Sequence, residues 1–365
     1  MFKKPVHQYL ILFLEFLCVS VIALSFTSFV GVKTTEAKTQ RIEGNIGTWD
    51  LINSPVTDDL RSIAMTSANN GWAVGGSGTI LHWNGITWSE ANSPTTQPLL
   101  DVKMISADNG WAVGGMGTIL HWDGISWNLV DSPTVNNLLS IDFISPNEGW
   151  AVGFSTSGFA RYGTILKWNG SVWSAIISNQ IDFGYRTVEA VATDNVWVVG
   201  AYQKTYGYPN PGSDPPILVT GHWDGQVWNM KVEPQCNNWI NSLAVMSDYT
   251  GWGVGTYGCI LTFNGGWEDW VPEACTDCVL ISIVIVAADD VWVVGGDTMV
   301  GSGKSLILHW NGSTWDVTPN PGNEKLWGVG MTSANNGWAV GDGGTILHYT
   351  NSPDYQYLYL PLVIH

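Results

Sequence analysis

The sequence predicts an all-β fold, a seven-bladed β-propeller closed by an N-terminal strand that completes the last blade. Three observations lead to this prediction. A Gly-Trp-Ala-Val-Gly phrase, first seen at 71–75, recurs along the chain; its spacing suits four-stranded blades; and the two ends of the chain supply complementary parts of one blade. The seven copies centre on these tryptophans: Trp72, Trp111, Trp150, Trp197, Trp252, Trp292 and Trp338.

Each copy is expected to form four short strands. In the first copy, 60–66 alternates apolar and small residues, as a half-buried strand does, and 68–71 has the Asn and Gly residues of a tight turn. Strands at 72–75, 79–83 and 87–90 follow, separated by glycine-rich turns. Because so small a unit cannot bury both faces alone, we expect the copies to pack radially, each on the next.

The ends of the chain predict how the ring closes. The last copy stops at Asn351 without a fourth strand, whereas a spare strand at 47–50 precedes the first copy. Ser54-Pro55 follows that spare strand just as Ser93-Pro94 follows the fourth strand of the first copy. We therefore expect 47–50 to pair into the last blade, which removes the open sheet edges that favour aggregation.

The chain divides into three parts: a signal peptide or N-terminal anchor at 1–37, the propeller at 46–351 and an apolar tail at 352–365. The leader has Lys3 and Lys4 before an apolar run at 9–32, the pattern of an export signal. The run is long enough to span a bilayer if it is not cleaved. The protein is thus expected to be secreted or extracytoplasmic, or anchored through residues 9–32.

Composition excludes several classes of partner. The 365 residues contain 31 Asp and Glu against 14 Lys and Arg, a net charge of −17. Nucleic acid and anionic membrane surfaces both require clustered bases, so neither is an expected partner. Since 45% of the residues are hydrophobic, there is ample apolar surface to form a core.

Repeated tryptophans and histidines are expected to be structural. Tryptophans at equivalent positions should lie between blades, and five histidines share another repeat position (His82, His121, His222, His309 and His348). Equivalent residues on the outer strands diverge from blade to blade, so these histidines cannot share one metal ion. We found no nucleophile elbow, metal-binding His-Glu pair or phosphate loop, and we expect no catalytic residue, metal or cofactor.

The phrases Asn70-Gly71-Trp72-Ala73-Val74-Gly75 and Gly78-Thr79-Ile80-Leu81-His82, followed by a glycine turn and Trp88, resemble a known family. The chain is similar to propellers of the photosystem II assembly and stability factor type, which are related to BNR/Asp-box repeat proteins. The resemblance covers about 46–351 and all seven copies. It implies an exported, non-catalytic propeller that holds another protein. The chain departs from the arginine-rich face of those factors, since it has four Arg in all.

Positions that differ between copies indicate where function lies. Insertions at 154–162, 202–216 and 297–304 all fall between second and third strands, and therefore on one face. The same face and the adjoining axis collect non-repeated polar and aromatic residues, which we predict to bind a partner or ligand: Arg61, Asp101, Lys103, Asp142, Arg161, Tyr185, Arg186, Glu189, Trp239 and Trp327. For the charges nearest the axis, an internal ion-pair network and a binding pocket both remain open.

Four cysteines follow the leader and cluster around the fifth blade: Cys236, Cys259, Cys275 and Cys278. Outside the cytoplasm disulfides are the usual state, and four cysteines allow three pairings. We expect two structural disulfides. A redox pair at Cys275 and Cys278 is the alternative, although no helix N-terminus is predicted there to lower a thiol pKa.

The most favoured function is a monomeric, protein-binding scaffold or assembly factor that acts on an envelope or extracellular protein. The alternative is a lectin-like propeller that binds a glycan through Trp239, Trp327 and nearby tyrosines, because aromatic faces stack on sugars. A sialidase-like hydrolase is a weaker alternative, since Arg61, Arg161 and Arg186 would have to converge as a triad on one carboxylate.

Overall fold

The computed structural model describes residues 47–157, 160–202, 217–233, 239–246, 250–264, 267–270, 277–297 and 303–351. They form seven antiparallel sheets of four strands each. The sheets, or blades, are numbered along the chain. Blades 1 to 3 contain β2 (Leu60–Ser67), β3 (Asn70–Gly75), β4 (Ile80–Trp83) and β5 (Trp88–Glu90); β6 (Leu99–Ser106), β7 (Asn109–Gly114), β8 (Ile119–Trp122) and β9 (Trp127–Leu129); and β10 (Asn137–Ser145), β11 (Glu148–Ser157), β12 (Ala160–Trp168) and β13 (Trp173–Ile181).

Blades 4 to 6 contain β14 (Phe183–Ala192), β15 (Asn195–Tyr202), β16 (Ile217–Trp223) and β17 (Trp228–Glu233); β18 (Ile240–Val245), β19 (Thr250–Gly255), β20 (Ile260–Asn264) and β21 (Trp267–Trp270); and β22 (Val279–Ala287), β23 (Asp290–Gly296), β24 (Ser305–Trp310) and β25 (Trp315–Val317). Blade 7 contains β26 (Leu326–Ser333), β27 (Asn336–Gly341), β28 (Ile346–Thr350) and, from the start of the chain, β1 (Thr48–Ile52). Short 3₁₀ turns, η1 (Gly76–Gly78), η2 (Gly115–Gly117) and η3 (Asp342–Gly344), follow β3, β7 and β27.

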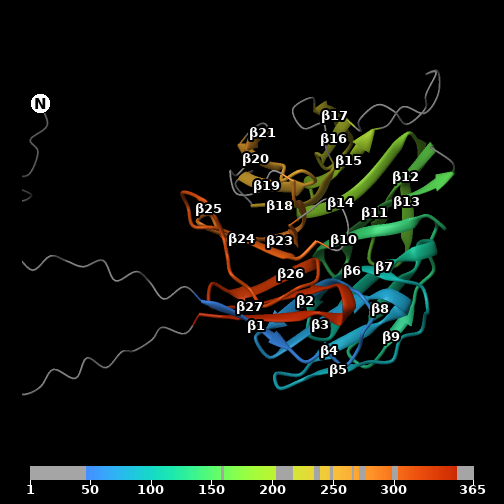
Figure 1. Cartoon of the computed structure of the whole chain (residues 1–365). Coiled ribbons are helices and arrows are strands. Elements are labelled where there is room, and N and C mark those ends of the chain that lie inside the picture. The colour runs from blue at the N-terminus through green and yellow to red at the C-terminus, as the bar shows by residue number, and fades with distance from the viewer. Residues whose placement is uncertain are drawn as a thin grey trace, which may run out of the picture. The chain divides into compact units, whose positions relative to one another are not determined.

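The first strand of each blade faces the centre of a closed ring (Figure 1). The seven inner strands contact one another in chain order, and β26 of blade 7 packs against β2 of blade 1. The ring is sealed within blade 7, where β1 pairs antiparallel with β28 and Trp49 lies opposite Tyr349. The prediction of a seven-bladed propeller is confirmed, and its N-terminal strand completes the last blade.

The repeated tryptophans form the packing between blades. Trp72 of blade 1 contacts Trp122 and Trp127 of blade 2, with ring centroids 4.6 and 5.3 Å apart. Trp338 of blade 7 makes the same contacts with blade 1 across the seam. A buried tryptophan removes about 150–250 Å² from water, an upper bound of about 4–6 kcal/mol, so these residues stabilise the ring as expected.

The shared histidine position supports that tryptophan packing. His82 Nε2 lies 2.7 Å from the amide oxygen of Asn70, and the His82 ring packs at 4.4 Å on Trp72. His121 repeats both contacts in blade 2, at 3.1 and 4.4 Å. Burial lowers the pKa of His82 and of His121, which favours the neutral ring in this stack. The position is therefore structural, as expected.

Several predictions concern residues outside the described part of the chain. The leader at 1–37 and the tail at 352–365 both lie there, as do most of the insertions at 202–216 and 297–304. Within the described residues, no helix is long and apolar enough to cross a membrane. Cys259 and Cys278 are buried and disulfide-bonded. Cys236 and Cys275 lie outside the described residues, so the pairing of the four cysteines stays a prediction.

Candidate functional site

A break in strand register recurs at the start of every inner strand. In blade 1, Leu60 pairs with Gly75 and Ser62 with Val74, which leaves Arg61 as an extra residue. The corresponding extra residues in the other blades are Leu100, Leu139, Arg186, Asn241, Ile281 and Trp327. Such a bulge redirects side chains locally. Here the extra residue and the one after it both face the axis.

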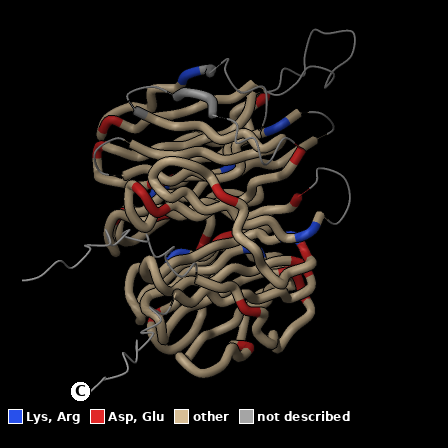
Figure 2. Tube along the Cα trace, turned by 60° about the vertical axis from the view of Figure 1, so that its left-hand side comes forward, with Lys and Arg blue, Asp and Glu red and all other residues tan. Residues whose placement is uncertain are grey.

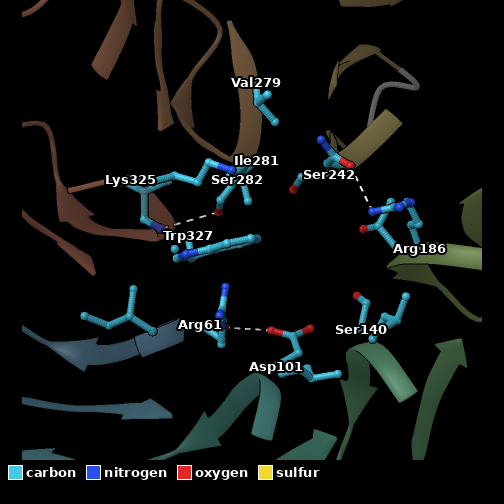
Figure 3. A pocket seen from close by; sticks show the side chains of 18 of the residues that line it. Arg61, Asp101, Ser140, Arg186, Ser242, Val279, Ile281, Ser282, Lys325 and Trp327 are labelled. Carbon is cyan, nitrogen blue, oxygen red and sulfur yellow. Dashed lines mark hydrogen bonds between the residues drawn. The ribbon is translucent and has the colours of Figure 1, made fainter. Parts of the chain in front are cut away.

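These residues line a central cavity of about 540 Å³ at the end where the inner strands begin. Every inner strand contributes to its wall, and Figure 3 shows Arg61 and Arg186 on opposite sides of it. We call this end of the ring the entrance face. The cavity is mixed in character, since it combines Trp239 and Trp327 with the side chains of Ser242 and Ile281. A space of this size suits part of a polypeptide or a small molecule.

One cation–aromatic cluster lies where blades 7 and 1 meet. The Arg61 guanidinium lies 4.0 Å from the ring centroid of Trp327, and the Lys325 ammonium lies 5.0 Å from it. Arg61 also pairs with Asp59 at 2.7 Å and approaches Asp342 at 3.8 Å. The Trp327 indole N–H donates to Asp342 at 2.5 Å. We call these five residues (Asp59, Arg61, Lys325, Trp327 and Asp342) the blade 7/1 cluster. In it, the carboxylates of Asp59 and Asp342 balance the charge of Arg61.

A second cluster lies across the cavity, around Trp239. The guanidinium carbons of Arg161 and Arg186 lie 4.2 and 4.5 Å from the Trp239 ring centroid. Arg186 donates one hydrogen bond, of 3.1 Å, to the side-chain oxygen of Asn241. Burial, together with the charge of Arg161, lowers the pKa of Arg186 to about 10, so it remains protonated at neutral pH. We call Arg161, Arg186 and Trp239 the Trp239 cluster.

The insertion at 154–162 is what brings Arg161 to this cluster. We expected a grown loop, but most of the segment extends β11 and β12 into a longer hairpin, in which Arg161 pairs with Thr156. The longer hairpin places the Arg161 guanidinium 5.9 Å from the Phe154 ring and over Trp239 of blade 5.

Deeper along the axis, the predicted charges tie blades together. Asp101 accepts hydrogen bonds from the Ser62 hydroxyl of blade 1 and the Ile141 amide of blade 3. Asp142 forms a 2.6 Å ion pair with Lys103 and accepts a 2.7 Å hydrogen bond from the Ala190 amide of blade 4. The structure therefore supports the ion-pair role for Lys103 and Asp142, whereas Asp101 links blades through hydrogen bonds.

Together with Lys103 and Asp142, Glu189 forms a charged layer deeper along the axis than the residues that line the cavity, and we call this layer the floor. The pKa of Glu189 is raised to about 8, first because it is buried and second because the Asp142 carboxylate is near. Lys103 partly opposes that rise, and the carboxylates around Lys103 raise its own pKa in turn. The floor thus carries excess negative charge when Glu189 ionises, whereas the mouth above it carries positive charge.

The prediction that Tyr185 binds a partner is wrong. Tyr185 is only 1% exposed and packs in the core with Trp150 and Val188. Its hydroxyl donates to the Gln180 side chain. The register explains the error, because Tyr185 pairs with Gly200 just as Leu60 pairs with Gly75. Tyr185 therefore occupies a core position that is leucine or isoleucine in the other blades.

Of the ten predicted residues, five meet at the mouth of the cavity: Arg61, Arg161, Arg186, Trp239 and Trp327. The arginines do not form a triad, since Arg61 is engaged with Asp59 while Arg161 and Arg186 lie over Trp239. Three residues of the mouth were missed: Asp59, Lys325 and Asp342. A signal was present, because Asp59 and Lys325 occupy the same variable repeat position as Trp239.

The chemistry of the mouth favours recognition of an anionic or polar chain segment. Positive charge is sparse over the described chain, as Figure 2 shows, yet three of the four arginines gather here. The ring faces of Trp239 and Trp327 that contact these cations are covered. Stacking of a sugar on those faces, as the lectin hypothesis requires, would displace the cations first.

No protein-family model matches the chain, and no curated protein matches it either. Solved structures with the same fold include YCF48 bound to a D1 peptide, with a TM-score of 0.63 and 19% identity over 84% of this chain and 96% of that one. YCF48 from Cyanidioschyzon merolae gives 0.61 and 17%, over 83% and 99%. The WD40 propeller domain of Doa1 gives 0.61 and 13%, over 84% and 98%. At these identities the likeness concerns the fold.

Proposed function

We propose that this protein is a non-catalytic, protein-binding propeller that receives a segment of a partner polypeptide at its entrance face. The observation that carries the proposal is the cavity of about 540 Å³, at whose mouth Arg161, Arg186 and Trp239 meet. Arginine and tryptophan are the residues most enriched where protein partners bind tightly.

The contacts made by the ionisable groups of the floor and the mouth support a binding site rather than a catalytic one. The ionisable groups of the floor are engaged in ties between blades, such as the Lys103–Asp142 ion pair. The mouth offers cations and indole rings but no paired general acid and base among the described residues. YCF48, which has the same fold, was solved with a D1 peptide bound, so a propeller of this kind can hold a polypeptide segment.

We also propose that residues 1–37 direct export and that the partner is an envelope or extracellular protein. The support is the basic start of the chain and the apolar run at 9–32. Mass spectrometry of the protein isolated from its host tests this proposal. A chain that begins near Lys38 supports cleavage and export, and a cytoplasmic chain that begins at Met1 contradicts it.

The binding proposal is tested by blocking the mouth. Leu139 lines the cavity, so Leu139→Trp should fill part of it, whereas Ile125→Trp adds the same bulk on the β8–β9 turn at the opposite face. Protein purified from the host with its partner should retain that partner in Ile125→Trp and lose it in Leu139→Trp. Equal retention in two variants that melt like the wild type would contradict binding at the entrance face.

A further inference from the structure

The two arginine–tryptophan clusters of the mouth are built alike but differ in how their charge is balanced. Each places an arginine over a tryptophan from the neighbouring blade, Arg61 over Trp327 and Arg186 over Trp239. Asp59 and Asp342 lie 2.7 and 3.8 Å from Arg61 and balance its charge within the protein. The blade 7/1 cluster is therefore complete without a ligand.

The Trp239 cluster has no such balance. Among the described residues, no carboxylate oxygen lies within 4.0 Å of the guanidinium of Arg161 or Arg186. Nη1 of Arg161 and Nε of Arg186 are buried and donate no hydrogen bond to any described residue. Leaving a buried polar donor unpaired destabilises the folded chain, and more so when the group is charged. The positive charge of both guanidiniums is thus left without a counter-ion from the described residues, and a partner can supply one at their accessible atoms.

We propose that Arg161 and Arg186, held over Trp239, form a subsite for a single carboxylate carried by the bound partner. The inference rests on the proposed function, since it names the group of the partner that enters this side of the mouth. A carboxylate is planar and presents two acceptor oxygens, which match the paired N–H donors of a guanidinium. Polyanions are disfavoured because the chain carries a net charge of −17.

The surroundings fix where the carboxylate stops. Stacking on Trp239 and the hydrogen bond from Arg186 to Asn241 hold the guanidiniums in place before binding, so little side-chain order has to be created. Below the mouth, the Lys103 ammonium is already paired with the Asp142 carboxylate at 2.6 Å, so it is not available to draw an anion deeper along the axis. The carboxylate is therefore retained at the rim of the cavity and does not reach its floor.

The test is calorimetric titration of the purified chain at constant ionic strength. Two probes separate the possible sources of the carboxylate: N-acetylglutamate α-amide has only a side-chain carboxylate, and N-acetylalanine has only a terminal one. N-acetylglutamine amide is the neutral control, and inorganic phosphate is the competing anion. The variants are Arg186→Gln and Arg161→Gln, with Arg61→Gln as the matched control at the balanced cluster.

We expect at least one carboxylate probe to bind the wild type and Arg61→Gln with affinities within about threefold. Loss of charged hydrogen bonds worth about 1.5–3 kcal/mol should weaken that probe at least about tenfold in Arg186→Gln and in Arg161→Gln. If Arg186→Gln does not fold, Arg186→Lys replaces it, because lysine keeps the positive charge but lacks the paired N–H donors of a guanidinium. Arg186→Lys should also lower the affinity for the probe.

Three results would overturn the subsite: equal binding by the glutamine variants, equal binding of the neutral amide, or tighter binding of phosphate than of either carboxylate. The outcome is separable from that of the proposed function. If the probes bind as expected but Leu139→Trp retains the partner, the subsite stands and the entrance-face function falls. If the probes fail and Leu139→Trp loses the partner, the reverse holds.

Discussion

Trp49 and Tyr349 lie opposite each other in the same sheet, with ring centroids 5.2 Å apart, although they come from the two ends of the described chain. Trp49 also packs edge-on against Trp292 of blade 6, at 5.7 Å. This contact joins the first strand of the chain to the last hairpin and to the preceding blade. The ring is therefore closed by side-chain packing as well as by the β1–β28 ladder.

Replacing Trp49 should weaken the whole ring. Trp49 is 3% exposed, so Trp49→Ala is expected to lower the free energy of unfolding by about 3–5 kcal/mol. Urea denaturation measures this change. Leu51→Ala, two residues further along the same strand at a residue that is 59% exposed, is the matched control and should change it by less than about 0.5 kcal/mol. Equal effects would contradict closure by β1.

The turn after β27 predicts a contrast between two adjacent glycines. Both Gly343 and Gly344 have positive φ, 61° and 74°. A Cβ at Gly344 would lie 2.1 Å from the Val56 carbonyl oxygen, whereas one at Gly343 would meet nothing within 4 Å. Ser77 and Met116 occupy the position of Gly343 in blades 1 and 2.

We therefore expect Gly344→Ala to lower the free energy of unfolding by more than about 2 kcal/mol, and Gly343→Ala by about 1 kcal/mol or less. Thermal unfolding of the two variants checks the contrast. A Gly343→Ala variant as unstable as Gly344→Ala would show that φ alone, and not the close approach of Val56, limits the turn.

Glu189 should make stability depend on pH. Its pKa rises from 4.5 to about 8 on folding, so the folded chain holds a proton that the unfolded chain releases between these values. The free energy of unfolding should therefore fall as pH rises from about 4.5 to 8, by at most about 1.4 kcal/mol per pH unit from this group. Below about pH 4.5 Glu189 is protonated in both the folded and the unfolded chain, so it no longer makes the free energy of unfolding depend on pH.

Glu189→Gln removes that contribution, and urea denaturation between pH 5 and pH 8 measures the change in slope. The variant should lose less stability over this interval than the wild type does. Glu90→Gln, at an exposed position of β5, is the control and should leave the slope unchanged. A slope that is the same in all three proteins would contradict the burial of an acid at the floor.

The repeated phrases were enough to predict the ring, its seven blades and its closure, because each repeat contains similar turn residues and a tryptophan at the same position. The mouth could be predicted only in part. Arg61, Arg186 and Trp327 stood out as variable positions, and the register break that turns them toward the axis has no sequence signature. Arg61 and Arg186 both lie over an indole, and whether a carboxylate also lies within reach, as for Arg61, depends on the residues that surround each arginine in three dimensions.

The wrong prediction for Tyr185 is explained by its position along the repeat. Tyr185 is one residue before Arg186, and alternation alone does not separate a core residue from a mouth residue next to a bulge. Alignment on the glycine that each one faces, Gly200 for Tyr185 and Gly75 for Leu60, makes the distinction. The same alignment identifies Asp59 and Lys325 as residues of the mouth.

The central claim is that the partner binds at the entrance face, and photo-crosslinking in the host tests it most directly. Photoreactive benzoylphenylalanine would replace Leu100, which lines the cavity, or Ile125 on the opposite face. We expect irradiation to attach one discrete protein at position 100 and none at position 125. Attachment of that protein only at position 125, or equally at both, would contradict the claim.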